Sequence, residues 1–169
     1  MDILLLVILG LLVGETLLHG WVDLINLRHV NPEIPDEFEG WYDAEKYSKS
    51  QRYLADSTRF DLLRSGITTA IIVVFILGGG FAWFDDLARG AGAGVVGTGL
   101  CFGALTWLFT QIVGLPFNIY GTFVLEEKYG FNKMTLRTVI LDFLKELLLT
   151  ALLGGLVFTL IILFFVYAG

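Results

Sequence analysis

Four apolar stretches alternate with polar segments along the chain, at residues 3–27, 66–84, 91–115 and 147–168. A helix of about 20 mostly apolar residues crosses the ~30 Å hydrocarbon layer of a bilayer. Inside that layer a helix satisfies all of its own backbone hydrogen bonds. We therefore predict an all-α fold, a polytopic membrane protein with four transmembrane helices in a single membrane domain over residues 1–169.

The first long polar segment, residues 28–65, begins with two prolines that break a helix. Asp36 and Glu39 have the spacing of a capping box, which marks a new helix start. From Trp41 onwards, charged and aromatic residues interleave and predict an amphipathic interfacial helix that runs directly into the second span. We expect this helix to pack against the loop at residues 123–135, with binding of lipid headgroups or of a substrate peptide as the alternative. Acidic residues interleave with the basic ones here, which argues against a strong anionic-lipid site: Asp43, Glu45, Asp56 and Asp61.

The second long polar segment covers residues 116–146. Pro116 is expected to end the third span, because a proline lacks the N–H that a helix interior needs. A short loop is expected at residues 85–89. A further helix is predicted from Thr135 to Tyr167, and at 1.5 Å per residue it is roughly 50 Å long. It therefore extends well beyond the bilayer, as does the helix before the second span.

Composition supports the membrane assignment, since 56% of the 169 residues are hydrophobic and the mean hydropathy is +0.74. The net charge of −6 leaves no basic stripe to neutralise phosphates, which excludes a nucleic-acid partner. Four spans place both long polar segments on one side of the membrane. Ten of the eleven basic residues lie in these segments, and only Arg89 lies elsewhere. The positive-inside rule then makes both segments cytoplasmic and both termini extracytoplasmic.

Polar residues inside the first span follow a helical spacing. Glu15, His19 and Asp23 lie at i, i+4 and i+8, so they share one helical face. Ionisable groups at membrane depth normally face a protein interior or a water-filled cavity. We interpret them as a stripe that lines a polar cavity or bonds to other helices. Ion or proton handling is an alternative, whereas three ligands on one straight helix do not surround a metal.

Glycines mark a close-packing face in the third span. Gly99 and Gly103 are four residues apart, which is the small-xxx-small spacing that lets two membrane helices approach each other. The Gly92–Gly97 run formally matches a dinucleotide-binding fingerprint, but no β-strand precedes it. We discount that function, and no cofactor is expected in this chain.

The run from Phe123 to Thr135 carries the densest information in the chain. Two adjacent carboxylates precede a glycine that permits positive φ. Asn132 and Thr135 come next, and either side chain can cap the following helix. We expect this run, the signature loop, to have a definite shape next to the membrane. Its candidate residues are Glu126, Glu127, Gly130, Phe131, Asn132 and Thr135.

The sequence Val124-Leu-Glu-Glu-Lys-Tyr-Gly-Phe-Asn132, followed by Thr135, resembles a signature of the type I CAAX prenyl protease family of zinc metallopeptidases. The signature lies in the N-terminal membrane domain of that family. A second match upstream runs from Tyr47 to Tyr53 and continues at Asp56, Arg59 and Phe60. The order, the spacing and the surrounding apolar segments agree, so the resemblance covers most of the chain.

The resemblance implies a membrane zinc metalloendopeptidase whose helices enclose a water-filled chamber. The family binds zinc through a helical His-Glu-x-x-His motif. This sequence has only His19 and His29, ten residues apart, so it lacks that motif and is expected to be inactive alone. The expected partners are the lipid bilayer, a C-terminal zinc protease half in cis or on a partner chain, and a peptide or membrane-protein substrate. We expect a fragment of a longer enzyme, with a natural stand-alone domain as the alternative.

Two questions stay open at this point. Glu126 and Glu127 order the signature loop, through its own groups or through bases of residues 28–65, form a solvated acidic pair, or take a direct part in chemistry. The chain as a whole supplies chamber wall and substrate access for the protease, or acts as a membrane scaffold subunit. A small proton- or ion-coupled transporter subunit that uses the stripe is the remaining alternative.

Overall fold

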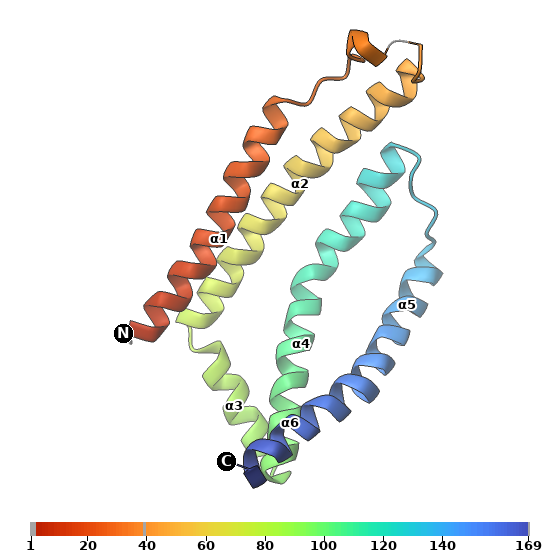
Figure 1. Ribbon diagram of the computed structural model, residues 1–169. Coiled ribbons are helices and arrows are strands. Elements are labelled where there is room, and N and C mark those ends of the chain that lie inside the picture. Colours follow the sequence, from red (N-terminus) through yellow and green to blue (C-terminus); the bar gives the residue numbers. More distant parts are fainter. Residues whose placement is uncertain (1–2, 39, 169) are drawn as a thin grey trace. The chain divides into compact units, whose positions relative to one another are not determined.

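The computed structural model describes residues 3–38 and 40–168, and every regular element in these ranges is helical (Figure 1). The expected all-α class is thus confirmed. The Glu39 half of the expected capping box lies outside the described residues. In chain order the elements are α1 (Ile3–Arg28), the 3₁₀ turn η1 (Asp36–Phe38), α2 (Ala44–Leu77), α3 (Gly80–Gly90), α4 (Gly94–Tyr120), the π-helical η2 (Gly121–Glu126), α5 (Leu136–Leu149), the π-helical η3 (Thr150–Gly154) and α6 (Gly155–Ala168).

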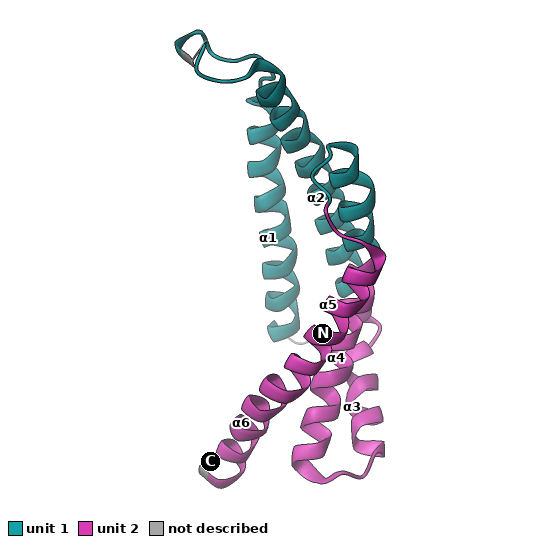
Figure 2. Cartoon of the chain, turned by 90° about the vertical axis from the view of Figure 1, so that its right-hand side faces the viewer, with its two compact units in different colours: residues 1–74, 116–132 teal, residues 75–115, 133–169 magenta. Residues whose placement is uncertain are grey.

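The chain folds into two compact units, shown in different colours in Figure 2. Unit 1 consists of residues 1–74 and 116–132, and unit 2 consists of residues 75–115 and 133–169. Each unit therefore combines two segments that are distant in sequence. The long helices α2 and α4 each contribute residues to both units.

In unit 1, α1 and α2 run side by side (Figure 1). The Thr16 and Thr69 hydroxyls share a hydrogen bond of 2.8 Å across the pair. A Cβ added to Gly20 would lie 3.4 Å from Leu62 Cδ2. The glycine therefore leaves room for the Leu62 side chain of α2 against α1. Small and hydroxyl-bearing residues are the usual contacts between membrane helices, because hydrophobic burial gives no advantage inside lipid.

Unit 2 is held by aromatic rings and by the glycine face of α4. Phe84 and Ala88 of α3 are buried, and Phe75 stacks on Phe109 with ring centroids 4.2 Å apart. A Cβ on Gly99 would lie 2.5 Å from Ile162 Cδ1. One on Gly103 would lie 3.1 Å from the Phe158 ring, so α6 packs where these glycines leave room, as their spacing predicted.

The expected amphipathic helix and the second span form one continuous helix, α2, which confirms that prediction. The predicted continuity of residues 66–84 is wrong. Gly79 has φ +75°, and the chain leaves α2 there and restarts as α3. Gly78-Gly79-Gly80 explains the break, because glycine is a poor helix former that enters the left-handed region without strain. The loop expected at residues 85–89 is accordingly helical, and Arg89 pairs with Asp85 at 2.7 Å.

Pro116 lies inside α4, so the prediction that it ends the helix is wrong. A proline in a helix interior costs one backbone hydrogen bond, which packing of the rest of the helix can offset. The helix then widens into η2, five residues after the proline. Short π segments inside α-helices are frequent at functional sites.

Four helices of the described residues are long and apolar enough to cross a membrane: Ile3–Arg28, Ala44–Leu77, Gly94–Glu126 and Leu136–Tyr167. The helix predicted from Thr135 to Tyr167 is present as α5, η3 and α6 in succession. In all four helices, none of the most apolar stretch is buried by the rest of the protein. Apolar surfaces of this length are expected to contact lipid. The chain is therefore a multi-pass integral membrane protein.

Candidate functional site: the signature loop against helix α2

Three backbone N–H groups of the signature loop converge on the carbonyl oxygen of Glu126. This oxygen accepts hydrogen bonds from the N–H groups of Tyr129 at 3.2 Å and Phe131 at 2.9 Å, and more weakly from Asn132 at 3.4 Å. Gly130 has φ +66°, the left-handed conformation expected for it, and its N–H donates to the Glu127 carbonyl at 2.9 Å. A left-handed glycine after the last helical turn is a common way to satisfy the final carbonyls of a helix.

Side chains close the loop on both sides of this turn. Asn132 Nδ2 donates to Glu127 Oε2 at 3.0 Å, so the Glu127 carboxylate spans the turn. Thr135, at the N-terminus of α5, accepts from the Thr138 N–H at 3.2 Å. Of the two candidate caps, Thr135 is therefore the one that caps α5, and Asn132 bonds within the loop.

Asp56 of α2 collects three partners, two of them from the signature loop. Asp56 Oδ2 accepts from Lys128 Nζ at 2.6 Å and from the Tyr129 hydroxyl at 2.6 Å. Asp56 Oδ1 lies 3.5 Å from Arg59 Nη1. Tyr129 is 7% exposed and is one of the few buried side chains of the described residues, so the base of the loop is anchored on α2.

Aromatic rings extend this contact. Tyr53 of α2 meets Tyr129 edge to face, with ring centroids 5.4 Å apart, and meets Phe131 at 4.9 Å. Lys49 Nζ lies 5.4 Å from the centre of the Phe131 ring, a distance at which a cation is attracted by the ring face. The expected packing of the amphipathic helix against the signature loop is thus observed, and the two matching motifs are in contact.

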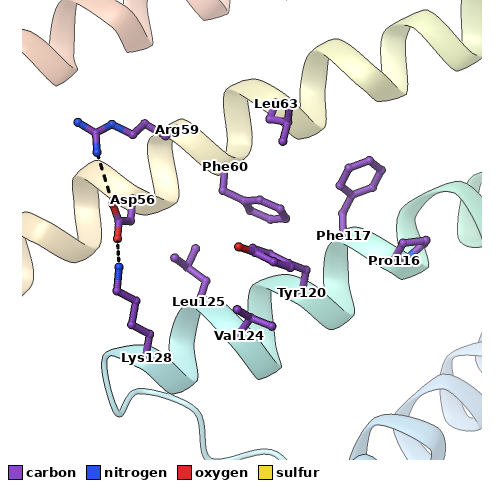
Figure 3. Close-up of a pocket in the computed structure, with 10 residues that line it drawn as sticks. All are labelled: Asp56, Arg59, Phe60, Leu63, Pro116, Phe117, Tyr120, Val124, Leu125 and Lys128. Atoms are coloured by element: carbon purple, nitrogen blue, oxygen red, sulfur yellow. Dashed lines mark hydrogen bonds and ion pairs between the residues drawn. The ribbon is translucent and has the colours of Figure 1, made fainter.

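Beside these contacts lies a hollow of about 650 Å³ between α2 and the end of α4 (Figure 3). Asp56, Arg59 and Lys128 stand at one end of it, and apolar side chains line the rest. The Phe60 and Tyr120 rings stack across it with centroids 5.0 Å apart. The remaining lining residues are Leu63, Pro116, Phe117, Val124 and Leu125.

The charges at Asp56 shift its titration and that of its partners. Asp56 lies in the charged half of α2, ten residues before the apolar stretch that begins at Gly66. Hydrogen bonds from Lys128 and then Tyr129 lower the pKa of the Asp56 carboxyl. The same bonds raise the pKa of the Lys128 ammonium and of the Tyr129 hydroxyl. All three groups are therefore held in the charge states that bind one another at neutral pH.

The two glutamates of the loop have different surroundings. Glu127 is exposed and accepts from Asn132, whereas Glu126 is half-buried and acts through its backbone carbonyl. The acid that pairs with a base across the two segments is Asp56, on α2, and the base is Lys128 of the loop. Sequence reasoning placed Asp56 in the second motif but gave it no role.

The stripe lies on α1, away from the signature loop. Glu15 and His19 are exposed, and Asp23 is half-buried. Their neighbours Thr16 and Gly20 are the residues that contact α2. A pocket at this contact is lined by His19 and Asp23 together with Leu62, Ser65 and Gly66 of α2. Glu15 lies outside that lining.

Comparison with known proteins identifies the family of this chain. Residues 23–169 match the family described as CAAX prenyl protease N-terminal, five membrane helices. The chain belongs to this family. A probable CAAX prenyl protease 1 of Schizosaccharomyces pombe is 35% identical over 144 residues, which cover 78% of this chain and 30% of the relative. A CAAX prenyl protease 1 homolog of Oryza sativa is 34% identical over 131 residues, 73% of this chain and 31% of the relative.

A solved structure agrees. The crystal structure of Saccharomyces mikatae Ste24p superposes with a TM-score of 0.83 at 28% identity, covering 95% of this chain and 39% of that one. The chain thus spans about a third of the length of the CAAX prenyl proteases that it matches. The two motifs that pointed to this family from the sequence are the two that meet at Asp56.

Proposed function

We propose that this chain is the N-terminal transmembrane part of a membrane zinc metalloendopeptidase of the CAAX prenyl protease kind. It forms part of the wall of an intramembrane chamber and part of the path by which substrate enters. It does not catalyse the reaction by itself. The observation that carries the proposal is the match over residues 23–169, together with the assembly of both matching motifs into one contact at Asp56.

The stripe supports the chamber. Thr16 and Gly20 take up the contact with α2, which leaves Glu15 and His19 exposed at membrane depth. Ionisable side chains are costly against lipid and normally face water or other protein. We assign this face of α1 to the chamber.

The zinc chemistry belongs to polypeptide outside this chain. The sequence holds two histidines, ten residues apart, whereas two histidines must lie one helical turn apart to bind zinc in a His-Glu-x-x-His helix. The expected substrate of the complete enzyme is a prenylated peptide or a membrane protein. The partner of this chain is then a C-terminal zinc protease half, in cis or on another chain.

The membrane topology follows the same reasoning. The 2.6 Å contact between Asp56 and Lys128 supports an even number of crossings between them, which α2 and α4 provide. Helix α3 has 11 residues, roughly 16 Å at 1.5 Å each, and is too short to cross. We place residues 28–65 and 116–146 in the cytoplasm and both termini outside it, on the basis of the basic residues in these segments.

Thiol labelling tests the chamber wall in the native polypeptide. Cys101→Ser removes the one thiol of these 169 residues, and any cysteine elsewhere in the polypeptide is replaced in the same way. Glu15→Cys or His19→Cys then adds one reporter. Val13→Cys is the control, because Val13 lies two residues before Glu15 on the opposite face of α1, is 38% exposed and is outside the pocket that His19 lines. A hydrophilic maleimide reacts with a thiolate, which forms only in contact with water.

We expect Glu15→Cys and His19→Cys to be labelled and Val13→Cys to be protected. Protection of all three positions would place the stripe against lipid or tightly packed protein and would contradict a water-filled chamber on this face. A separate measurement tests the division of labour. The 169-residue chain alone should bind no stoichiometric zinc and should leave a farnesylated C-terminal peptide uncleaved, and one-to-one zinc binding would overturn the assignment.

A further inference from the structure

We propose that unit 1 holds one anionic phospholipid, with its phosphate among Arg52, Arg59 and Lys128 and an acyl chain in the hollow between α2 and the end of α4. The argument rests on two adjoining pockets, one polar and one apolar, that share their charged residues.

The polar pocket is the one beside the end of α1. It has a volume of about 390 Å³ and is lined by residues of α2, by Lys128 and Tyr129, and by the segment that follows α1. Three cations face it, namely Arg52, Arg59 and Lys128, and Asp56 is the only acidic residue among the described residues of its lining. The pocket therefore carries a net charge of about +2, with His absent from the lining.

Many donors of these cations remain free after the contacts with Asp56 are made. Lys128 has three N–H donors and gives one to Asp56. Arg59 approaches Asp56 with one nitrogen at 3.5 Å, and its side chain is 70% exposed. Arg52 is exposed and is one helical turn from Asp56 on the same face of α2. Arginine presents a planar fork of N–H donors that matches a phosphate group, so Arg52 and Arg59 have donors to offer to a phosphate beside Asp56.

The apolar pocket begins where the polar one ends. Asp56, Arg59 and Lys128 line both, and beyond them the second pocket is walled by Phe60, Leu63, Phe117 and Tyr120 (Figure 3). A ligand that fills both must have an anionic head and an apolar tail. The charge complementarity and the continuity of the two pockets therefore select an amphiphile over a free anion.

The depth of the site fits a lipid. Leu63 and Phe60 precede the apolar stretch of α2 by three and six residues, which is roughly 5 and 9 Å along a helix. The headgroup layer extends about 5–8 Å on each side of the hydrocarbon. The apolar walls thus lie level with the headgroup layer, beside the hydrocarbon, and Arg59 lies roughly 10 Å from the apolar stretch, so its long side chain reaches back toward the phosphates. Basic pockets between membrane helices on the cytoplasmic side are a recognised type of headgroup site.

Native mass spectrometry on the delipidated native polypeptide tests the proposal. The probes are dioleoylphosphatidylglycerol, which is anionic, dioleoylphosphatidylcholine, which is zwitterionic, and inorganic phosphate. Arg52→Gln with Arg59→Gln removes two charges from the site. Lys145→Gln is the matched control, since Lys145 is equally exposed and lies in unit 2. Leu63→Trp fills the apolar pocket without a change of charge.

We expect the wild type and Lys145→Gln to retain one phosphatidylglycerol in preference to phosphatidylcholine. The double arginine variant should lose about fivefold in affinity for each charge removed. Leu63→Trp should lose affinity for the lipid and keep any weak affinity for inorganic phosphate. A circular-dichroism melt of each variant confirms that it is folded.

Three results would overturn the proposal. One is equal retention of phosphatidylglycerol by the double arginine variant and by Lys145→Gln. Another is binding of inorganic phosphate as tight as that of the lipid, which would make the site an anion site alone. The third is that the molecule bound in the site is displaced by a farnesylated peptide but not by added phosphatidylglycerol, which would make it a substrate site. None of these results depends on protease activity.

Discussion

Lys128 Nζ lies 2.6 Å from Asp56 Oδ2, across 72 residues of sequence. This ion pair joins helix α2 to the signature loop. The Tyr129 hydroxyl binds the same carboxylate oxygen, so one acidic side chain secures two neighbouring residues of the loop. Removal of that carboxylate should therefore loosen the loop as a whole.

Asp56→Asn is expected to lower the free energy of unfolding of unit 1 by about 1.5 kcal/mol, because hydrogen bonds to a charged group are stronger than those to an amide. Thermal unfolding in detergent, followed by circular dichroism, measures the change. Asp142→Asn is the control, since its pair with Lys145 lies within one helix and is exposed. A change of equal size in both variants would contradict a special role for Asp56.

Tyr129→Phe separates the hydroxyl from the ring. The ring contacts with Tyr53 and Phe131 remain, and the bond to Asp56 is lost, so we expect a loss of about 1 kcal/mol. Tyr120→Phe serves as the matched control. Its ring stacks on Phe60 in the same unit, and none of its described contacts involves the hydroxyl. Equal stability of the two variants would show that the hydroxyl bond contributes nothing.

The pH dependence follows from the lowered pKa of Asp56. A carboxyl with a folded-state pKa below its unfolded-state value adds stability at all pH values above the unfolded one. That stability is lost as the pH falls through the folded-state pKa. We expect the melting temperature to fall below about pH 4, where an unperturbed aspartate begins to take up its proton. Asp56→Asn should show less of this acid-dependent fall, and identical pH profiles would contradict the assignment.

Gly103→Val tests the packing of unit 2. A Cβ at Gly103 would lie 3.1 Å from the Phe158 ring, so the larger side chain should separate α4 from α6 and cost about 1–3 kcal/mol. Gly155→Val is the control, because nothing lies within 4 Å of its position. Phe158→Ala should partly rescue the Gly103 variant, and additive losses in the double variant would contradict direct contact.

Several features of this fold could be predicted because each depends on residues close in sequence. Thr135 caps the helix that follows it, and Gly130 takes a positive φ because the turn requires it. The spacing of Gly99 and Gly103 predicted a close contact, although the partner residues on α6 had no sequence signal of their own. The family resemblance followed from two short motifs in the same way.

The features that the sequence did not predict depend on tertiary contacts. Pro116 stays inside α4 because packing can offset one missing hydrogen bond, which a local rule does not include. The break at Gly79 had a visible signal in three consecutive glycines, which the apolar residues around them outweighed. The pairing of Asp56 with Lys128 joins two segments whose charges, read separately, resemble solvated helix faces.

The most direct test of the account is the sidedness of the two motif-bearing segments. Lys46→Cys and Lys133→Cys, each in the Cys101→Ser background, flank the contact at Asp56 and are exposed. An impermeant maleimide is added to sealed vesicles of known orientation that contain the native polypeptide. The account predicts that both thiols are labelled only from the cytoplasmic side. Labelling of the two from opposite sides would contradict it.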